Sequence, residues 1–67
     1  MLTYSVWMNR HGAMIVVLGT AKTQGIRDEE RGSAPYRRVK RIQATDYESA
    51  MIEARSYWDR LHEPLNF

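Results

Sequence analysis

The first ten residues alternate between apolar and polar side chains. One side of the alternation carries Leu2, Tyr4, Val6 and Met8, and the other side carries Thr3, Ser5, Trp7 and Asn9. A period of two predicts a β-strand with one buried face. Turn-forming residues follow at 9–12, where Gly12 is free to adopt a positive φ, and a second apolar run covers residues 13–18. The two runs therefore predict a β-hairpin.

The second run, AMIVVL, is apolar on both faces of the predicted strand. If one face packs on the core, either Ile15 or Val17 lies beside Trp7 on the outer face, where water is expected. Exposed apolar patches of this kind often mark a protein interface. A loop folded back over the sheet explains the same pattern, so both interpretations stay open.

Residues 20–35 show no periodicity and predict a long loop. The segment contains Gly25, Gly32, several charged residues and small polar side chains before Pro35. A loop of about fifteen residues is long for a small domain, and such loops are usually functional or disordered. The run RDEER at 27–31 has mixed charges and fits either a short helical turn or a solvated tip. This loop is the best candidate for a flexible segment that orders on binding.

A third strand is predicted over residues 36–44, which are rich in tyrosine, valine and isoleucine. Its alternation is imperfect, because Val39 falls on one face while Ile42 and Ala44 fall on the other. This indicates a bulge or an edge position. Four basic residues gather in this strand, namely Arg37, Arg38, Lys40 and Arg41. Such side chains protect an edge strand from wrong pairing, and they also bind phosphate or acidic protein, so both interpretations stay open.

The final third of the chain predicts an amphipathic helix. Thr45 and Glu48 form a T-x-x-E capping box, which predicts that Thr45 caps the helix. An apolar stripe at helical spacing follows, made of Tyr47, Ala50, Met51, Ala54, Trp58 and Leu61. Ile52 is an apolar outlier on the polar side. Glu63 and Pro64 are expected to end the helix, after which Phe67 could fold back on the core.

The order strand, strand, long loop, strand, helix predicts an α+β fold. The expected architecture is a three-stranded antiparallel sheet with the C-terminal helix packed on one face. At 67 residues the chain forms a single domain, 1–67, and buries only about 60% of the surface of its unfolded form.

Composition narrows the protein class. The chain has no cysteine, so neither disulfides nor thiolate metal sites can stabilise it, and the disulfide-rich secreted class is excluded. The first ten residues lack the features of a signal peptide, and no apolar run approaches the roughly 20 residues of a membrane span. We expect a cytoplasmic protein. Its net charge of +2 is mild, so the local basic cluster matters more than the total.

Enzymatic function finds no support in the sequence. His11 lies in the predicted turn and His62 at the helix end, and both are expected to be surface residues rather than ligands. The neighbouring acids at 28–30 are too close together and too flexible for acid–base catalysis or rigid metal binding. No catalytic residue, metal site or cofactor is therefore expected.

Two binding functions remain. In the first, a small regulator or inhibitor of phage or mobile-element type docks on a host protein or nucleoprotein complex. Its predicted interface is apolar and aromatic, comprising Trp7, Ile15, Val17, Tyr36 and Ile52, because aromatic and arginine residues dominate binding hot spots. Self-association through a sheet edge or the apolar face would give a homodimer.

The second function is nucleic-acid binding. Here the four basic residues of the third strand, together with Arg10, hold phosphates, while Trp7 and Tyr36 stack on bases. An acidic protein partner would be bound by the same basic residues, namely Arg37, Arg38, Lys40, Arg41 and Arg10.

The passage from the basic strand into ATDYESAMIEA (44–54) carries two family resemblances. The order of elements resembles the arm-binding domains of phage integrases and the plant AP2 domain, which implies a three-stranded sheet that enters the DNA major groove and a helix that braces it. The same passage resembles the end of HicB-like antitoxin domains, where a strand leads through a Thr or Asp cap into an E-A-rich helix. The long second loop departs from the integrase and AP2 pattern.

Overall fold

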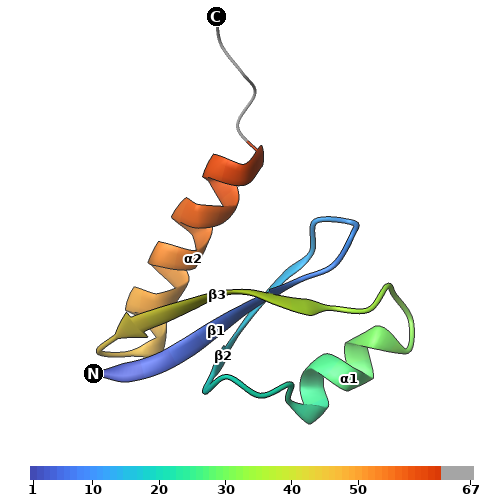
Figure 1. The fold of residues 1–67 in the computed structure, drawn as a ribbon, viewed down its shortest axis with the longest axis horizontal. Helices are drawn as coiled ribbons and strands as arrows, with labels where there is room; N and C mark the ends of the chain where they lie inside the picture. The colour runs from blue at the N-terminus through green and yellow to red at the C-terminus, as the bar shows by residue number, and fades with distance from the viewer. Residues whose placement is uncertain (63–67) are drawn as a thin grey trace, which may run out of the picture.

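A computed structural model describes residues 1–62, and the predictions for Glu63, Pro64 and Phe67 lie outside this range. The elements follow in the order β1 (Leu2–Met8), β2 (Met14–Leu18), α1 (Gln24–Glu30), β3 (Arg37–Ala44) and α2 (Tyr47–His62). Figure 1 shows the sheet with α2 and α1 packed against different parts of it. The predicted α+β class, with a three-stranded antiparallel sheet and a C-terminal helix, is confirmed.

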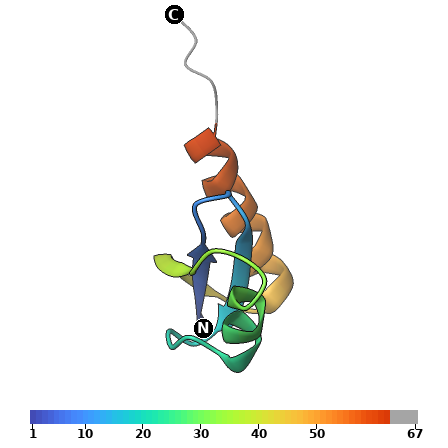
Figure 2. The same ribbon diagram turned by 90° about the vertical axis from the view of Figure 1, so that its right-hand side faces the viewer.

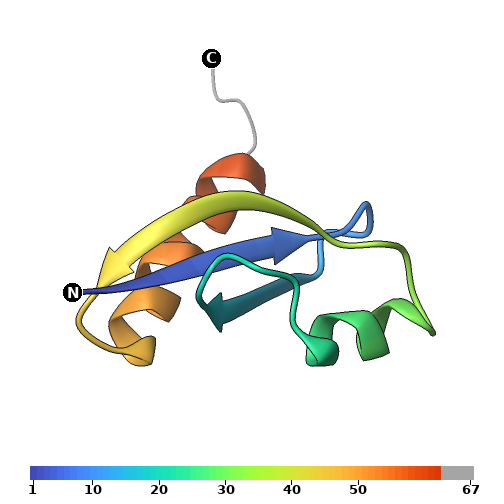
Figure 3. The same ribbon diagram turned by 60° about the horizontal axis from the view of Figure 1, so that its bottom comes forward.

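β1 is the central strand of the sheet. The strand order is β2-β1-β3, and both pairings are antiparallel (Figure 3). The hairpin register pairs Val6 with Val16 and Tyr4 with Leu18. On the other side, Tyr4 pairs with Ile42. β2 and β3 are therefore the two edges of the sheet.

The main core lies between the sheet and α2. Alternate β1 residues Tyr4 and Val6 are buried there against Ala50 and Ala54 of α2, both of which are 0% exposed. Alanine lets the helix backbone approach the sheet closely, because its side chain is only a methyl group. The remaining buried members of this cluster are Val16, Ile42 and Ala44. The alternation in β1 thus predicted which residues face α2, but the prediction of a single buried face is wrong, because Ser5 and Trp7 on the other face are buried as well.

The apolar stripe of α2 is only partly buried. Met51 and Trp58 are half-buried, whereas Tyr47 and Leu61 are 53% and 55% exposed. The ring of Tyr47 still contacts Tyr4 edge to face, with 6.2 Å between ring centroids. The stripe therefore predicted the direction of the helix face but not how far the sheet covers its two ends.

Helix α2 starts one residue later than the capping box predicted. Asp46, rather than Thr45, caps the helix, because its Oδ1 accepts a hydrogen bond from the Ser49 backbone N–H at 2.8 Å. This bond lowers the pKa of Asp46 below its ordinary value. β3 continues to Ala44, which pairs with Leu2, and Thr45 lies in the short turn between strand and helix.

The predicted loop at 20–35 contains a helix. α1 spans Gln24–Glu30, and Thr23 caps it by accepting a hydrogen bond from the Ile26 N–H at 3.3 Å. Ile26 is the single buried residue of α1 and is 0% exposed. One apolar side chain in seven produces no periodicity, so the pattern could not predict this helix.

Within residues 1–62, no helix has both the length and the apolar character needed to cross a membrane.

Candidate partner-binding surface

The basic strand β3 lies on an open edge of the sheet and carries a bulge. Val6 of β1 pairs with Lys40, but the next residue, Trp7, pairs with Arg38, so Val39 has no partner on β1. The sequence predicted a bulge or an edge position, and β3 has both.

The bulge divides the basic residues between the two faces of the sheet. Lys40 and Arg37 pair with Val6 and Met8 and so lie on the α2 side. The other two, Arg38 and Arg41, pair with Trp7 and Ser5 and lie on the opposite side. The four residues therefore do not form one flat patch. Instead they surround the exposed edge from both sides.

Two of the four basic side chains contact their own fold. Arg38 donates a hydrogen bond from its guanidinium to the carbonyl of Thr20 at 2.7 Å and so holds the segment after β2. The ammonium of Lys40 lies 5.2 Å from the centroid of the Tyr57 ring on α2, a cation–π distance. Arg37 and Arg41 are exposed and make no side-chain hydrogen bond within residues 1–62. These two are the best placed for a partner.

The positive charge of β3 is not neutralised by the part of the chain that the structure describes. The ion pairs found there join Lys22 to Glu30 at 2.6 Å and Arg31 to Asp28 at 3.8 Å. No basic residue of β3 takes part in either. The four positive charges of β3 are therefore left without a carboxylate partner in this part of the chain.

An open groove of about 670 Å³ adjoins the start of β3. It lies between the hairpin turn, the beginning of β3 and the last turns of α2. Its lining residues are Met8, Asn9, Arg10, Gly12, Pro35, Arg37, Val39, Tyr57, Leu61 and His62. The groove thus brings together Arg10 and Arg37, which the sequence proposed for the same role, and none of its lining residues within 1–62 is acidic. An acidic side chain with apolar neighbours would fit these walls.

A contact between the hairpin and α2 shapes one end of this groove. The indole Nε1 of Trp58 donates to the carbonyl of Gly12 at 2.8 Å, so the turn lies beside the helix (Figure 2). His62 stacks on Trp58 with ring centroids 4.0 Å apart, and its Nδ1 donates to the Trp58 carbonyl at 2.8 Å. Gly12 has a φ of +82°, a conformation that favours glycine.

The apolar patch predicted on the outer face is covered. Trp7 and Tyr36 are only 8% and 6% exposed, and with Ile26 of α1 they form a second core cluster. Ile15 and Val17 pack against this cluster and are half-buried. Of the two interpretations left open by the sequence, the structure supports the segment folded back over the sheet.

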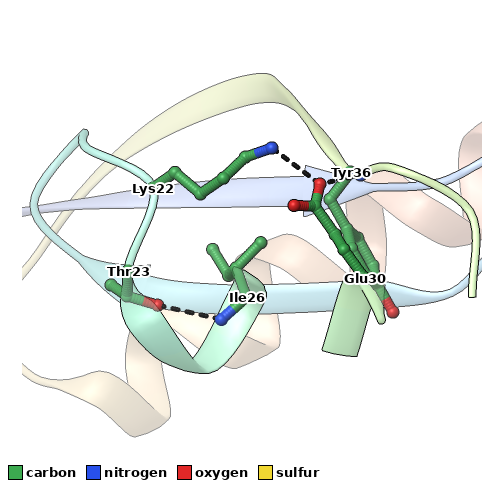
Figure 4. A network of polar contacts seen from close by, with 5 residues as sticks. All are labelled: Lys22, Thr23, Ile26, Glu30 and Tyr36. Carbon is green, nitrogen blue, oxygen red and sulfur yellow. Dashed lines mark hydrogen bonds and ion pairs between the residues drawn. The ribbon is translucent and has the colours of Figure 1, made fainter. Parts of the chain in front are cut away.

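Helix α1 is the cover of this face, and a polar network holds it in place (Figure 4). Glu30 Oε2 accepts hydrogen bonds from the Lys22 ammonium at 2.6 Å and from the Tyr36 backbone N–H at 2.7 Å. These two bonds, that of Lys22 first, lower the pKa of Glu30 below its ordinary value. The Lys22 ammonium also lies 5.7 Å from the centroid of the Trp7 ring. The last residue of α1 is thereby bonded to the segment between β2 and α1 and to the residue that precedes β3.

Ile52 is the one predicted interface residue that is largely exposed, at 68%, and it lies on α2 away from both clusters. Sequence reasoning missed the network residues Lys22 and Glu30 as well as Tyr57. Lys22 and Glu30 meet only because the predicted loop forms α1 and folds back on itself, and Tyr57 meets Lys40 only because α2 packs on the sheet. The described residues contain no group of three or more His, Asp or Glu side chains placed to hold a metal ion.

Comparison with protein-family models, with curated proteins and with solved structures found no match for this chain.

Proposed function

We propose that this chain is a small non-catalytic binding protein, a regulator or inhibitor of phage or mobile-element type. It docks on an acidic surface of a host protein or nucleoprotein complex through β3 and the adjoining groove. The observation that carries the proposal is the set of four basic residues on an open sheet edge, none of them paired with a carboxylate within residues 1–62. Arg37 and Arg41 support it most, because both are exposed and neither makes a side-chain hydrogen bond or ion pair within residues 1–62.

The contact residues of this proposal are the exposed Arg37 and Arg41, one on each side of the edge, with Arg10 across the groove from Arg37. Lys40 and Arg38 add charge while their own contacts hold them in place. A side chain fixed before binding loses less conformational entropy when the partner arrives. Opposite charges on the partner would also speed the encounter.

Nucleic acid is the second candidate partner, because a row of arginines suits phosphates as well as carboxylates. We rank it second for two reasons. Trp7 and Tyr36 are buried and cannot stack on bases. Helix α1 covers part of the sheet face that an integrase-arm or AP2-like domain would insert into the major groove. What remains for nucleic acid is contact with phosphates, without reading of bases.

The compartment that we propose is the cytoplasm, because a domain of this size without cysteine gains nothing from an oxidising environment.

The test is affinity capture from extract of the cells in which the gene occurs. The variant Arg37→Glu/Arg41→Glu is compared with the wild type and with Arg27→Glu/Arg60→Glu, a control that makes the same charge change at exposed positions of α1 and α2. We expect a protein that is captured by the wild type and the control, is lost with the β3 variant, and survives nuclease treatment. Loss of all captured proteins after nuclease would favour the nucleic-acid alternative. Equal capture by all three chains would contradict both.

A further inference from the structure

The two edges of the sheet differ in chemistry. β3 carries four basic residues and a bulge, both of which discourage pairing with another strand. β2 has the sequence MIVVL, with no charge and no proline, and its register with β1 is continuous. An apolar, regular edge strand is a template for pairing with a further strand.

The hydrogen-bonding groups of this edge can be assigned from two bonds that flank β2. The Asn9 N–H donates to the Ala13 carbonyl at 3.2 Å, and the Gly19 N–H donates to the Thr3 carbonyl at 2.8 Å. In an antiparallel pair such residues alternate, so positions 13, 15, 17 and 19 face β1. Met14, Val16 and Leu18 therefore direct their N–H and C=O groups outward, where no other strand of residues 1–62 pairs with them.

A protruding side chain and a shallow groove lie along the same edge. Leu18 is 60% exposed, and its pairing with Tyr4 places it on the α2 side of the sheet. A groove of about 310 Å³ lies beside β2 on that side, lined by Gly12, Met14, Met51, Arg55 and Trp58. The groove is largely apolar and contains Met14, which lies at the opposite end of β2 from Leu18.

We propose that a second copy of this chain pairs with β2, so that two sheets join into one of six strands. In an antiparallel pairing centred on Val16, Val16 lies opposite Val16 of the other copy. Met14 of each copy then lies opposite Leu18 of the other, so the outward N–H and C=O groups meet. Leu18 of each copy then lies over Met14 of the other and fills its groove. The same two surfaces are used by both copies, as a two-fold interface requires.

The joined sheet leaves room for the α2 helices of both copies. Three strands spaced about 4.8 Å apart give each copy about 14 Å of sheet width. A helix with its side chains is about 10 Å wide, so one α2 fits over each half of the joined sheet. In this arrangement the two basic β3 edges lie at the outer borders of the dimer, where both stay accessible to a partner.

The first test measures mass in solution by size exclusion with light scattering over a range of concentrations. We expect the wild type to approach twice its 7.9 kDa mass as concentration rises. Leu18→Lys should stay monomeric with an unchanged circular dichroism spectrum, because Leu18 is exposed in the single chain. Ile52→Lys, a similar change at an exposed site away from β2, should still dimerise. A monomer at every concentration, or a dimer that survives Leu18→Lys, would overturn the proposal.

The second test checks the register and uses the absence of native cysteine. Leu18→Cys and Met14→Cys chains are mixed under mild oxidation. In the proposed pairing the two positions lie opposite each other with Cα atoms about 5.5 Å apart, within the disulfide range, whereas the two Leu18 positions are about 14 Å apart. We expect a cross-linked dimer from the mixture and none from Leu18→Cys alone. Equal cross-linking of Leu18→Cys alone would refute this register.

Discussion

Ser5 is a fully buried polar residue in the middle of the central strand. It is 0% exposed, and its hydroxyl accepts a hydrogen bond from the Trp7 indole Nε1 at 2.8 Å. The bond lies on the outer face of the sheet, beneath the cover that α1 provides. It lets a large aromatic side chain be buried without leaving its N–H group unpaired.

Replacement of Ser5 by alanine should therefore destabilise the fold by about 1–3 kcal/mol, the usual cost of a buried donor left without an acceptor. Urea unfolding followed by circular dichroism measures the change. Thr3→Ala is the matched control, since Thr3 accepts a hydrogen bond from Gln43 at an exposed site of the same strand. If both variants lowered the free energy of unfolding equally, the buried hydrogen bond would contribute no more to stability than the exposed one.

Some residue-level features followed directly from the sequence and some did not. The alternation of β1 predicted which side chains share a face, because a strand places successive residues on opposite sides. The cap of α2 was predicted at Thr45, but β3 extends to Ala44 and the chain needs Thr45 for the turn, so Asp46 caps instead. Asp46 with Ser49 offers the same cap geometry one residue later, and local spacing alone cannot choose between them.

At the scale of elements, α1 explains the apolar outer face of the sheet. A seven-residue helix is too short to be stable by itself, so its contacts with the sheet must hold it. Those contacts are Ile26 within the second cluster and Glu30 with Lys22 and Tyr36 (Figure 4). The sequence pattern could not predict this helix, because its one buried side chain, Ile26, gives no periodicity and packs on Trp7 of β1, which is distant in the chain.

The cover formed by α1 should loosen in acid. The pKa of Glu30 is lower in the fold than its ordinary value of about 4.3, so folding favours the charged form. Its contacts therefore stabilise the cover fully above that ordinary value, and this stabilisation is lost as pH falls through the lower folded pKa. The indole N–H signal of Trp7 in NMR spectra should report the change between pH 7 and about pH 3.

Two comparisons isolate the contribution of Glu30. Trp58 donates its indole N–H to Gly12, remote from α1, so its signal should not follow the same transition. Glu30→Gln removes the titrating group and should abolish the transition at Trp7. An identical acid transition in Glu30→Gln would assign the effect to another residue.

At the scale of the whole molecule, the two edges of the sheet differ: β3 is basic and bulged, and we propose an acidic partner for it, whereas β2 is apolar and regular, and we propose a second copy for it. The fold class, the three strands and the C-terminal helix could be predicted from periodicity and turn residues. The basic residues of β3 were also predicted, but as one patch. The bulge at Val39 sets their actual arrangement on two faces, and it depends on the pairing between β1 and β3.

The predicted protein interface changed most between sequence and structure. In the sequence and in the structure alike, the apolar side chains on this face must be covered by other atoms. These side chains are Trp7, Tyr36, Ile15 and Val17. The sequence could not say whether that cover is a partner or the chain itself. Because α1 provides it, binding is expected at the β3 edge and not at the apolar cluster of Trp7, Ile15 and Val17.

The most direct test of this claim is NMR titration of the isotope-labelled chain with a glutamate-rich peptide at low salt. We predict that backbone amide shifts concentrate on β3 and on Arg10, that they diminish as salt rises, and that the Trp7 indole signal stays unchanged. Shifts centred on α1 and Trp7, or spread equally over Arg55 and Arg60 of α2, would contradict it.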